Sequence, residues 1–589
     1  MKKRNKHRRG GRPVRSAETA LLTYADKVNN VWSVISKHPF ISAFLIVVLL
    51  TPLCFGAQEN ISDSAKVLMC LLGLMLPIGI LVRLYGTRQI DAMTAASSSF
   101  GVFVAGLLVS KLFTHSDKGY LYIFFYMLAA IVFFRLSLMS DKEHRDRHNS
   151  FTIMALAFSI KFSYVLYTGC YVRQNDVGSF DKQTGHAAYI EYLLTNKHLP
   201  DFNPVTRWQF YHPPLHHSIS AGWIDLCENF FGASRNHARE SLQMLMLFYS
   251  MAMVIIVYKL LKHFGFSGRS LTVPLALFAF HPAFILSAGA INNDQLAALF
   301  TILTMLFVMR WLKDPTMKKI IPIAISIGCG MMTKLNVGTI APIVAVLFLW
   351  KLAKNPDRLL YFFKQYVVFG VICIPLALWY QTRNAIRWGT SFDYVPTVGG
   401  SQALSDDILG RLLDFSPKQF ASPFEAWIRA GASYNEYNPN VAILKNSLFG
   451  EEIRTENFPS GTVFIPTVLF WLGIVLALSA VVLSVIFLRK KYTEIPGYGK
   501  AFFGGYWLFS MFYFYLFCWE YPAVCTQNFR YLTPLMVVSV IQYAILFKHT
   551  ENAGKGTAAR VVRNVYTVLL ASFCALSVIT YLLVGYISV

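Results

Sequence analysis

Apolar runs close to twenty residues long recur almost from one end of this 589-residue chain to the other. A helix needs about twenty predominantly apolar residues to cross the hydrocarbon core of a bilayer. Over the whole chain 55% of residues are hydrophobic and 14% are charged, which excludes a chain of soluble domains. The sequence therefore predicts an all-α polytopic membrane protein with about fifteen transmembrane helices. The runs lie at 40–56, 66–84, 97–112, 120–138, 151–170, 242–260, 271–290, 295–312, 319–333, 337–352, 362–380, 462–488, 501–519, 531–547 and 565–586.

The distribution of basic residues predicts which side of the membrane each loop occupies. The N-terminal tail begins MKKRNKHRRGGRPVRS, which is rich in Lys and Arg and contains no acid. Basic residues close to a span favour the cytoplasmic side, so we expect the N-terminus to be cytoplasmic. Counting spans from there places the basic turns inside and the acidic loop 57–65 outside. We therefore expect a multi-pass plasma-membrane protein whose long loops 171–241 and 381–461 are extracytoplasmic.

The same charge pattern bears on partners. The formal net charge is +23, and Lys/Arg runs can bind nucleic-acid phosphates. A topogenic tail lying on anionic lipid explains the charge better, so we expect membrane lipids and no nucleic acid as partners. The nine cysteines show no zinc-type spacing, and the chain contains no Walker P-loop, HExxH, GxSxG or DxD motif.

The chain divides into three parts by composition. Residues 1–38 form the basic cytoplasmic tail, and residues 39–149 form a four-helix membrane extension with little polar content. From residue 150 to residue 589, the spans are separated by the two long outer loops. Long loops between spans carry function more often than mere connection, so we expect the active part to be 150–589.

The first outer loop contains a dense polar island. Asp176 follows the fifth span directly, and a carboxylate at the membrane surface beside apolar walls suits proton abstraction. A solvated or helix-capping Asp is the alternative. Residues 185–194 predict an amphipathic helix with its apolar face towards the membrane, and HPPLHH predicts the start of a second helix.

The segment QFYHPPLHH adds further candidates. His212 and His216 are four residues apart, which would put both on one helical face, as a metal-ligand pair requires. A divalent metal is thus one hypothesis, although the proposed chemistry requires no cofactor. The alternative is that Tyr211, His212 and His216 contact a phosphate or another part of the substrate.

Charged residues recur at other predicted outer helix ends. Asp294 opens the eighth span, where it is either a helix cap or a site residue. Lys334, Arg383 and Arg530 lie near the outer ends of later spans, where snorkelling would explain any one of them. Several cations on one side suit a phosphate at the membrane surface, because Arg binds it through a fork of donors and Lys through a point charge. Lys161, in the middle of the fifth span, has no obvious partner.

Five segments together resemble a known superfamily: RQNDVGSFD, GHAAYIEYLL, QFYHPPLHH, HPAFILSAGAINND and TKLN. They are similar to integral-membrane GT-C glycosyltransferases that use polyprenyl-phosphate sugars, a group that includes protein O-mannosyltransferases and the aminoarabinose lipid A transferase. The resemblance covers 150–589 and implies a GT-C-like module whose two long outer loops carry short helices. The chain departs from the pattern by its four preceding spans, and by Asn-Asp where many members carry paired acids.

The resemblance also implies roles for individual residues. Asp176 matches the catalytic base of the first outer loop, and Asp294 matches an acidic position in the next outer turn. Lys334, and more loosely Arg383 and Arg530, match basic positions that hold the donor phosphate.

The expected function is an inverting glycosyltransferase that moves a sugar from a polyprenyl-phosphate donor to an acceptor hydroxyl on a protein, lipid or glycan. A transporter or flippase of lipid-linked or anionic substrates is one alternative. Transporters tend to place polar residues near mid-membrane within repeated halves, whereas this chain places them in long loops and shows no repeat. A non-catalytic scaffold for envelope-polymer assembly is the other alternative, which turnover by purified protein would exclude.

Overall fold

The computed structural model describes residues 37–55, seven single positions from 68 to 86, and then 92–115, 117–137, 144–392, 394–396, 402–424, 438–489, 494–552 and 556–587. The described residues form helices and turns without a strand, which confirms the all-α prediction. Most of the basic tail 1–38 and the acidic loop 57–65 lie outside the described residues. The three-part division of the chain stays a prediction.

Helices account for the apolar runs. Each run coincides with helix except 66–84, most of which falls outside the described residues. The helices of the N-terminal part and the bundle are α2 (Pro39–Leu50), α4 (Ala92–Thr114), α5 (Gly119–Ser137), α6 (Arg145–Tyr167), α10 (Leu242–His263), α11 (Gly268–Phe280), α12 (Pro282–Leu286), α13 (Asp294–Lys313), α14 (Met317–Met331), α15 (Ala341–Ala353), α16 (Leu359–Trp388), α19 (Phe464–Arg489), α20 (Gly497–Glu520), α21 (Met536–Asn552) and α22 (Thr557–Val584).

Within the described ranges, 8 helices are long and apolar enough to cross a membrane, namely α6, α10, α13, α15, α16, α19, α20 and α22, some of them extended by an adjoining short helix. The bent pair α11–α12 would add one more span. The helices of the other described runs are not among these spans, so the count of about fifteen spans stays a prediction.

The bend between α11 and α12 has a local cause. Pro282 is the first residue of α12, and a proline disfavours the helical conformation in the residue before it. His281 is accordingly extended, and its ring Nδ1 accepts a hydrogen bond from the Ala283 N–H at 3.3 Å. The two helices meet at 56°, so the predicted run 271–290 is a broken helix.

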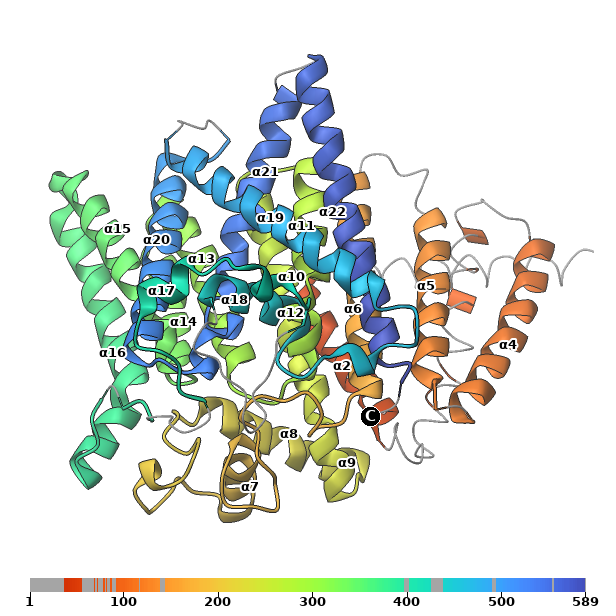
Figure 1. Cartoon of the computed structure of the whole chain (residues 1–589), viewed down its shortest axis with the longest axis horizontal. Helices are drawn as coiled ribbons and strands as arrows, with labels where there is room; N and C mark the ends of the chain where they lie inside the picture. The colour runs from red at the N-terminus through yellow and green to blue at the C-terminus, as the bar shows by residue number, and fades with distance from the viewer. Residues whose placement is uncertain are drawn as a thin grey trace, which may run out of the picture.

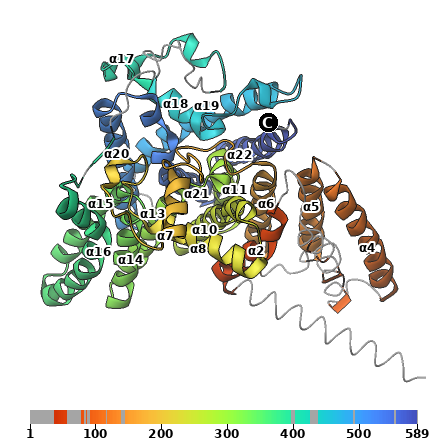
Figure 2. The same cartoon turned by 90° about the horizontal axis from the view of Figure 1, so that it is seen from below.

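The long loops 171–241 and 381–461 both contain the short helices that the sequence predicts. The first carries α7 (His186–Asn196), α8 (Leu215–Phe231) and α9 (Arg235–Glu240), and the second carries α17 (Ile408–Leu413) and α18 (Pro439–Phe449). Figure 1 shows α7, α8 and α9 at one end of the bundle and the adjoining ends of α21 and α22 at the opposite end. Seen from the α7 end, α17, α18 and α19 lie along one side of the bundle (Figure 2).

One prediction about the first loop is wrong. The apolar residues Ala188, Ile190 and Leu194 of α7 are buried in a core that α7 shares with α8, instead of facing the membrane. Ring stacking explains part of this packing, because Tyr189 lies against Phe210 with ring centroids 4.6 Å apart. The loop is therefore a packed cap on the bundle.

Lys161 lies fully buried in α6. Its ammonium donates to the Ser250 Oγ at 2.9 Å and lies 5.9 Å from the centre of the Phe284 ring. No acidic side chain pairs with it in the described part of the chain.

Candidate functional site

The backbone after α6 folds tightly around Asp176. Asp176 itself has a φ of +59°, and its carbonyl accepts a hydrogen bond from the His186 N–H at 3.2 Å. Gly185, with a φ of +100°, crosses the chain so closely that a Cβ there would lie 2.3 Å from the Val177 carbonyl oxygen. Only glycine accepts both the positive φ and this approach. The crossing fixes Asp176 against the start of α7.

Four charged side chains from separate segments meet beside this loop, and we call Asp176, Asp294, Lys334 and Arg530 the charged cluster. Arg530 lies in the 3-10 turn η10 (Phe529–Tyr531), and its Nη1 is 2.6 Å from Asp176 Oδ2 and 3.6 Å from Asp294 Oδ2. The other oxygen of Asp294 is 2.5 Å from the Lys334 Nζ. Acids and cations thus alternate across the cluster.

The cluster keeps Arg530 charged. Burial alone would lower the pKa of its guanidinium, but the neighbouring carboxylates, Asp176 first, outweigh burial and hold the pKa above its ordinary value. The side chains of Arg530, Lys334 and Asp294 are each 12% exposed, whereas Asp176 is 30% exposed. Asp176 is therefore the member of the cluster that a solvent-borne group reaches most easily.

A cavity of about 660 Å³ opens at the cluster, and we call it the large cavity. Asp176, Lys334 and Arg530 lie on its wall. Most of the remaining wall is apolar or aromatic and includes Leu335, Leu378, Phe392, Val395, Tyr506, Tyr513, Phe514 and Phe517. Such a site combines a charged end with an apolar wall, which suits an amphiphilic anion.

Asp294 does not cap its own helix but turns its side chain into the charged cluster. The helix α13 begins at Asp294, but the N–H of Asp294 is capped by the Asn292 Oδ1 at 3.1 Å. Its own carboxylate turns to Lys334 and Arg530. The predicted turn around Lys334 also occurs, since α14 ends at Met331 and the 3-10 helix η4 (Leu335–Ile340) begins just beyond Lys334.

The two histidines do not share a helical face, so that prediction is wrong. The helix α8 begins at Leu215, because Pro213 and Pro214 delay its start, and His212 lies in the turn before it. His212 lines the large cavity, whereas His216 is buried with its Nε2 3.4 Å from the Ile291 carbonyl.

This geometry gives metal ligation no support. No group of three or more His, Cys, Asp or Glu that could hold a metal ion occurs among the described residues. Burial lowers the pKa of His212 well below its usual value and that of His216 to about 4, so both rings are neutral near pH 7.

Tyr211 lines the large cavity beside Tyr394, with ring centroids 5.5 Å apart.

Arg383 lies outside the charged cluster. Its Nη2 donates to the Pro200 carbonyl at 2.6 Å, and its guanidinium lies 4.8 Å from the centre of the Trp388 ring. It is not on the wall of the large cavity. The guanidinium therefore links the loop 171–241 to α16.

The structure adds one acid that the sequence did not single out. Glu451 follows α18 and is 9% exposed, and its Oε1 accepts from the Asn528 Nδ2 at 2.5 Å. Burial raises the pKa of Glu451 to about 7, although Arg530 opposes the shift. Its only sequence signal is an acidic pair, Glu451-Glu452, near the end of the second outer loop.

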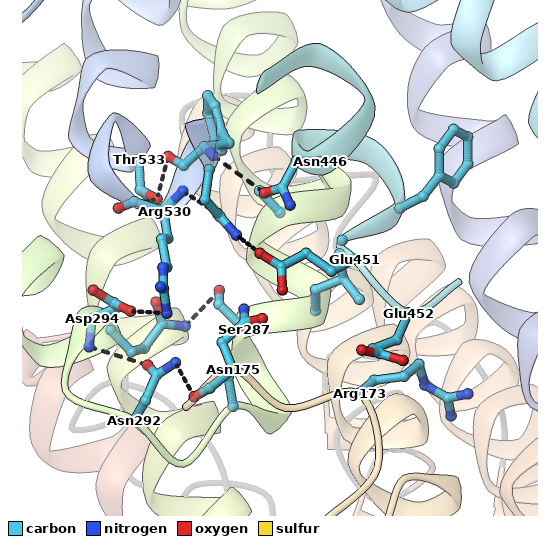
Figure 3. A pocket seen from close by; sticks show the side chains of 18 residues that line it. Arg173, Asn175, Ser287, Asn292, Asp294, Asn446, Glu451, Glu452, Arg530 and Thr533 are labelled. Atoms are coloured by element: carbon cyan, nitrogen blue, oxygen red, sulfur yellow. Dashed lines mark hydrogen bonds and ion pairs between the residues drawn. The ribbon is translucent and has the colours of Figure 1, made fainter. Parts of the chain in front are cut away.

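Glu451 lines a second, smaller cavity of about 80 Å³, which we call the small cavity. Figure 3 shows that Arg530, Asp294 and Glu451 line it together with several amide side chains. Arg530 lines both cavities and so lies between them.

One segment of the chain is similar to a known protein family. The family model of dolichyl-phosphate-mannose-protein mannosyltransferase matches residues 233–389. The matched segment holds Asp294 and Lys334, begins after Asp176 and ends before Arg530. None of the curated proteins matches the chain. Residues 233–389 are therefore similar to a GT-C family domain, and the match supports a membrane glycosyltransferase of the GT-C type.

Proposed function

We propose that this protein is an inverting glycosyltransferase that moves a sugar from a polyprenyl-phosphate donor to an acceptor hydroxyl. The observation that carries the proposal is the charged cluster at the wall of the large cavity. Two cations suit the donor phosphate, the apolar wall suits the lipid, and Asp176 lies beside both.

The donor phosphate binds between Lys334 and Arg530. Lys334 supplies a point charge and Arg530 a planar fork of donors, and both lie on the wall of the large cavity. Stabilising the negative charge that grows on the departing lipid phosphate is the largest contribution to catalysis, about 3 kcal/mol for one well-placed donor. Asp294 lies between the two cations, with its Oδ1 2.5 Å from the Lys334 Nζ and its Oδ2 3.6 Å from the Arg530 Nη1. Its carboxylate thus holds both cations beside the same site.

Asp176 acts as the general base. Arg530 holds its Oδ2, and in the described part of the chain no hydrogen bond reaches its Oδ1, which is therefore available to a hydroxyl. The acceptor oxygen attacks the anomeric carbon from the face opposite the phosphate while its proton passes to Asp176. The bond between the anomeric carbon and the phosphate oxygen breaks, and lipid phosphate leaves with both electrons. One displacement of this kind inverts the anomeric configuration.

The donor phosphate also changes the partners of Arg530. In this structure the guanidinium is shared by Asp176 and Asp294. A phosphate bound beside Lys334 competes for the same donors, because charge-assisted hydrogen bonds to phosphate are strong and often bidentate. The phosphate then takes part of the guanidinium contact from Asp176 Oδ2, while the acceptor hydroxyl binds at Oδ1.

The reaction takes place at the outer face of the plasma membrane. This part of the proposal rests on the basic residues of the N-terminal tail and of the α21–α22 turn, which favour the cytoplasmic side. The adjoining ends of α21 and α22 lie at the end of the bundle opposite α7, α8 and α9 (Figure 1). The first outer loop, which carries Asp176, is then extracytoplasmic.

The proposal is tested by turnover of purified protein in lipid nanodiscs. A panel of undecaprenyl-phosphate sugars is offered with hydroxyl acceptors, and lipid phosphate release is measured together with the anomeric configuration of the product. We expect one sugar to be transferred with inversion. Movement of intact donor between leaflets without cleavage would instead identify a flippase, and retention of configuration would contradict the single displacement.

A further inference from the structure

The turn that presents Arg530 is held by the side chain that precedes it. Asn528 caps η10, and its Oδ1 accepts a hydrogen bond from the Arg530 N–H at 2.9 Å. The opposite end of the same amide donates from Nδ2 to the Glu451 Oε1 at 2.5 Å. The amide of Asn528 therefore connects the Glu451 carboxylate to the backbone of Arg530.

A second contact from the same part of the chain supports this turn. The Asn446 Oδ1, on α18, accepts a hydrogen bond from the Phe529 N–H at 3.2 Å. Asn446 is 6% exposed and Asn528 is 2% exposed, so water does not easily replace either contact. The end of the second outer loop thus fixes the backbone on two successive residues, Phe529 and Arg530.

Glu451 itself does not reach the large cavity. It lines the small cavity together with Arg530, as Figure 3 shows, and it is not on the wall of the large cavity. The charged groups that act on its carboxyl are Arg530, Asp176 and Glu452, and Asp294 lines the same small cavity. Its one hydrogen bond among the described residues goes to Asn528.

We infer that Glu451 is a positioning residue: it holds the Asn528 amide, and that amide fixes the turn that aims Arg530 at the donor phosphate. The inference rests on the proposed function, because it gives Glu451 its role through the phosphate site. An error of about 1 Å in a charged group at a reacting centre can cost roughly a hundredfold in rate, so a remote hydrogen bond of this kind can control binding and turnover.

Reversing the polarity of the pair tests the inference. In Asn528→Asp the new carboxyl faces that of Glu451 at the site of the 2.5 Å contact. A close carboxyl pair keeps one proton near neutral pH, so the variants are compared at about pH 9 or above, where both groups are ionised and the hydrogen bond is lost. Adding Glu451→Gln restores it in the opposite sense, because the introduced amide donates to the new carboxylate. The second carboxylate oxygen at position 528 still accepts from the Arg530 N–H. Glu451→Gln alone keeps an oxygen that accepts from Asn528.

The measured quantities are the dissociation constant of undecaprenyl phosphate and the donor KM, each with the full-length protein in nanodiscs. We expect N528D to raise both by roughly tenfold or more, and the double variant E451Q/N528D to return them to within about threefold of the wild type. E451Q alone should stay within about threefold as well. The acceptor KM should not follow this pattern.

Two results would overturn the inference: N528D that binds lipid phosphate as the wild type does, or a folded double variant that is no better than N528D. If N528D fails to fold, the comparison of Glu451→Ala with Glu451→Gln decides, since only the alanine variant loses the acceptor for Asn528. Equal binding by these two variants contradicts the inference. A wild type that neither binds undecaprenyl phosphate nor cleaves any donor refutes the proposed function, and the inference with it, before any variant is compared.

Discussion

Arg530 offers a quantitative test of how the charged cluster works. Its Nη1 lies 2.6 Å from Asp176 and 3.6 Å from Asp294, and its Nη2 donates to the Tyr531 hydroxyl at 3.2 Å. Lys at this position keeps the charge but replaces the planar fork by one ammonium group. Gln removes the charge. The two substitutions therefore separate the geometry of the guanidinium from its charge.

The expected magnitudes follow from these contacts. Losing a well-placed donor to a developing anion costs about 3 to 4 kcal/mol, so Arg530→Gln should lower kcat/KM for lipid phosphate release by roughly two to three powers of ten. Arg530→Lys should lose about 1.5 to 3 kcal/mol, or roughly ten- to a hundredfold, because the charge stays. Arg387→Gln, on an exposed side chain that lines neither cavity, is the matched control and should stay within about threefold.

Stability should respond less than activity to the same change. Removing one partner of a fully buried ion pair costs about 3 to 5 kcal/mol. Here Asp294 keeps Lys334 at 2.5 Å, and Asp176 is 30% exposed and can be hydrated. We therefore expect a loss below that range, about 1 to 2 kcal/mol, seen as a small fall in the thermal unfolding midpoint. A folded Arg530→Gln protein with wild-type kcat/KM would refute the assignment of Arg530 to the phosphate.

Three further substitutions test Asp294, Gly185 and Glu451. Asp294→Asn removes the anion that competes with phosphate for both cations, so undecaprenyl phosphate should bind several-fold more tightly and leave more slowly; weaker binding would contradict this. Gly185→Ala forces a Cβ to within 2.3 Å of the Val177 carbonyl at positive φ, and should lower the unfolding midpoint and abolish turnover; unchanged stability would show that the crossing relaxes freely. The raised pKa of Glu451, about 7 against 4.5 for the free group, means that the wild type loses stability as pH rises from about 4.5 to 7. The thermal unfolding midpoint of Glu451→Gln should therefore rise relative to that of the wild type over this pH window. Above the window the difference between the two midpoints should stay constant, as thermal unfolding at a series of pH values would show.

Part of the site could be predicted because each residue stands at the end of an apolar run. Asp294, Lys334 and Arg530 directly flank apolar runs, Asp176 follows the run 151–170 closely, and the structure brings all four together. Charge is costly near lipid, so charges kept at helix ends indicate a shared polar site. Sequence cannot say which carboxylate pairs with which cation, because that depends on distances between segments far apart in the chain.

The predictions that fail do so for local reasons. His212 and His216 have helical spacing, but spacing matters only if the helix includes both, and two prolines delay its start. Arg383 matches a basic position loosely and donates to the Pro200 carbonyl in this structure, so its role at a phosphate stays a prediction. The apolar face of α7 has the pattern of a membrane-surface helix, and α8 covers it instead. Helical periodicity shows which face is buried but not what buries it.

Glu451 illustrates what a sequence does not contain. It lies far along the chain from Asp176 and outside any motif, and its importance comes from burial and from one contact with Asn528. Neither can be read from residue types in a long irregular loop. The bend at Pro282, in contrast, follows from the proline itself, although the apolar run hides it.

The most direct test of the central claim is the single-turnover rate of sugar transfer by Asp176→Asn, with Asp181→Asn as the matched control. Asp181 belongs to the same loop, is 73% exposed and pairs with Arg239 outside the charged cluster. The account predicts that Asp176→Asn lowers the single-turnover rate by roughly a hundredfold or more. This variant should bind undecaprenyl phosphate at least as tightly as the wild type does. The rate of Asp181→Asn should be nearly unchanged. An Asp176→Asn protein that transfers sugar at a rate close to the wild type would contradict the assignment of Asp176 as the general base.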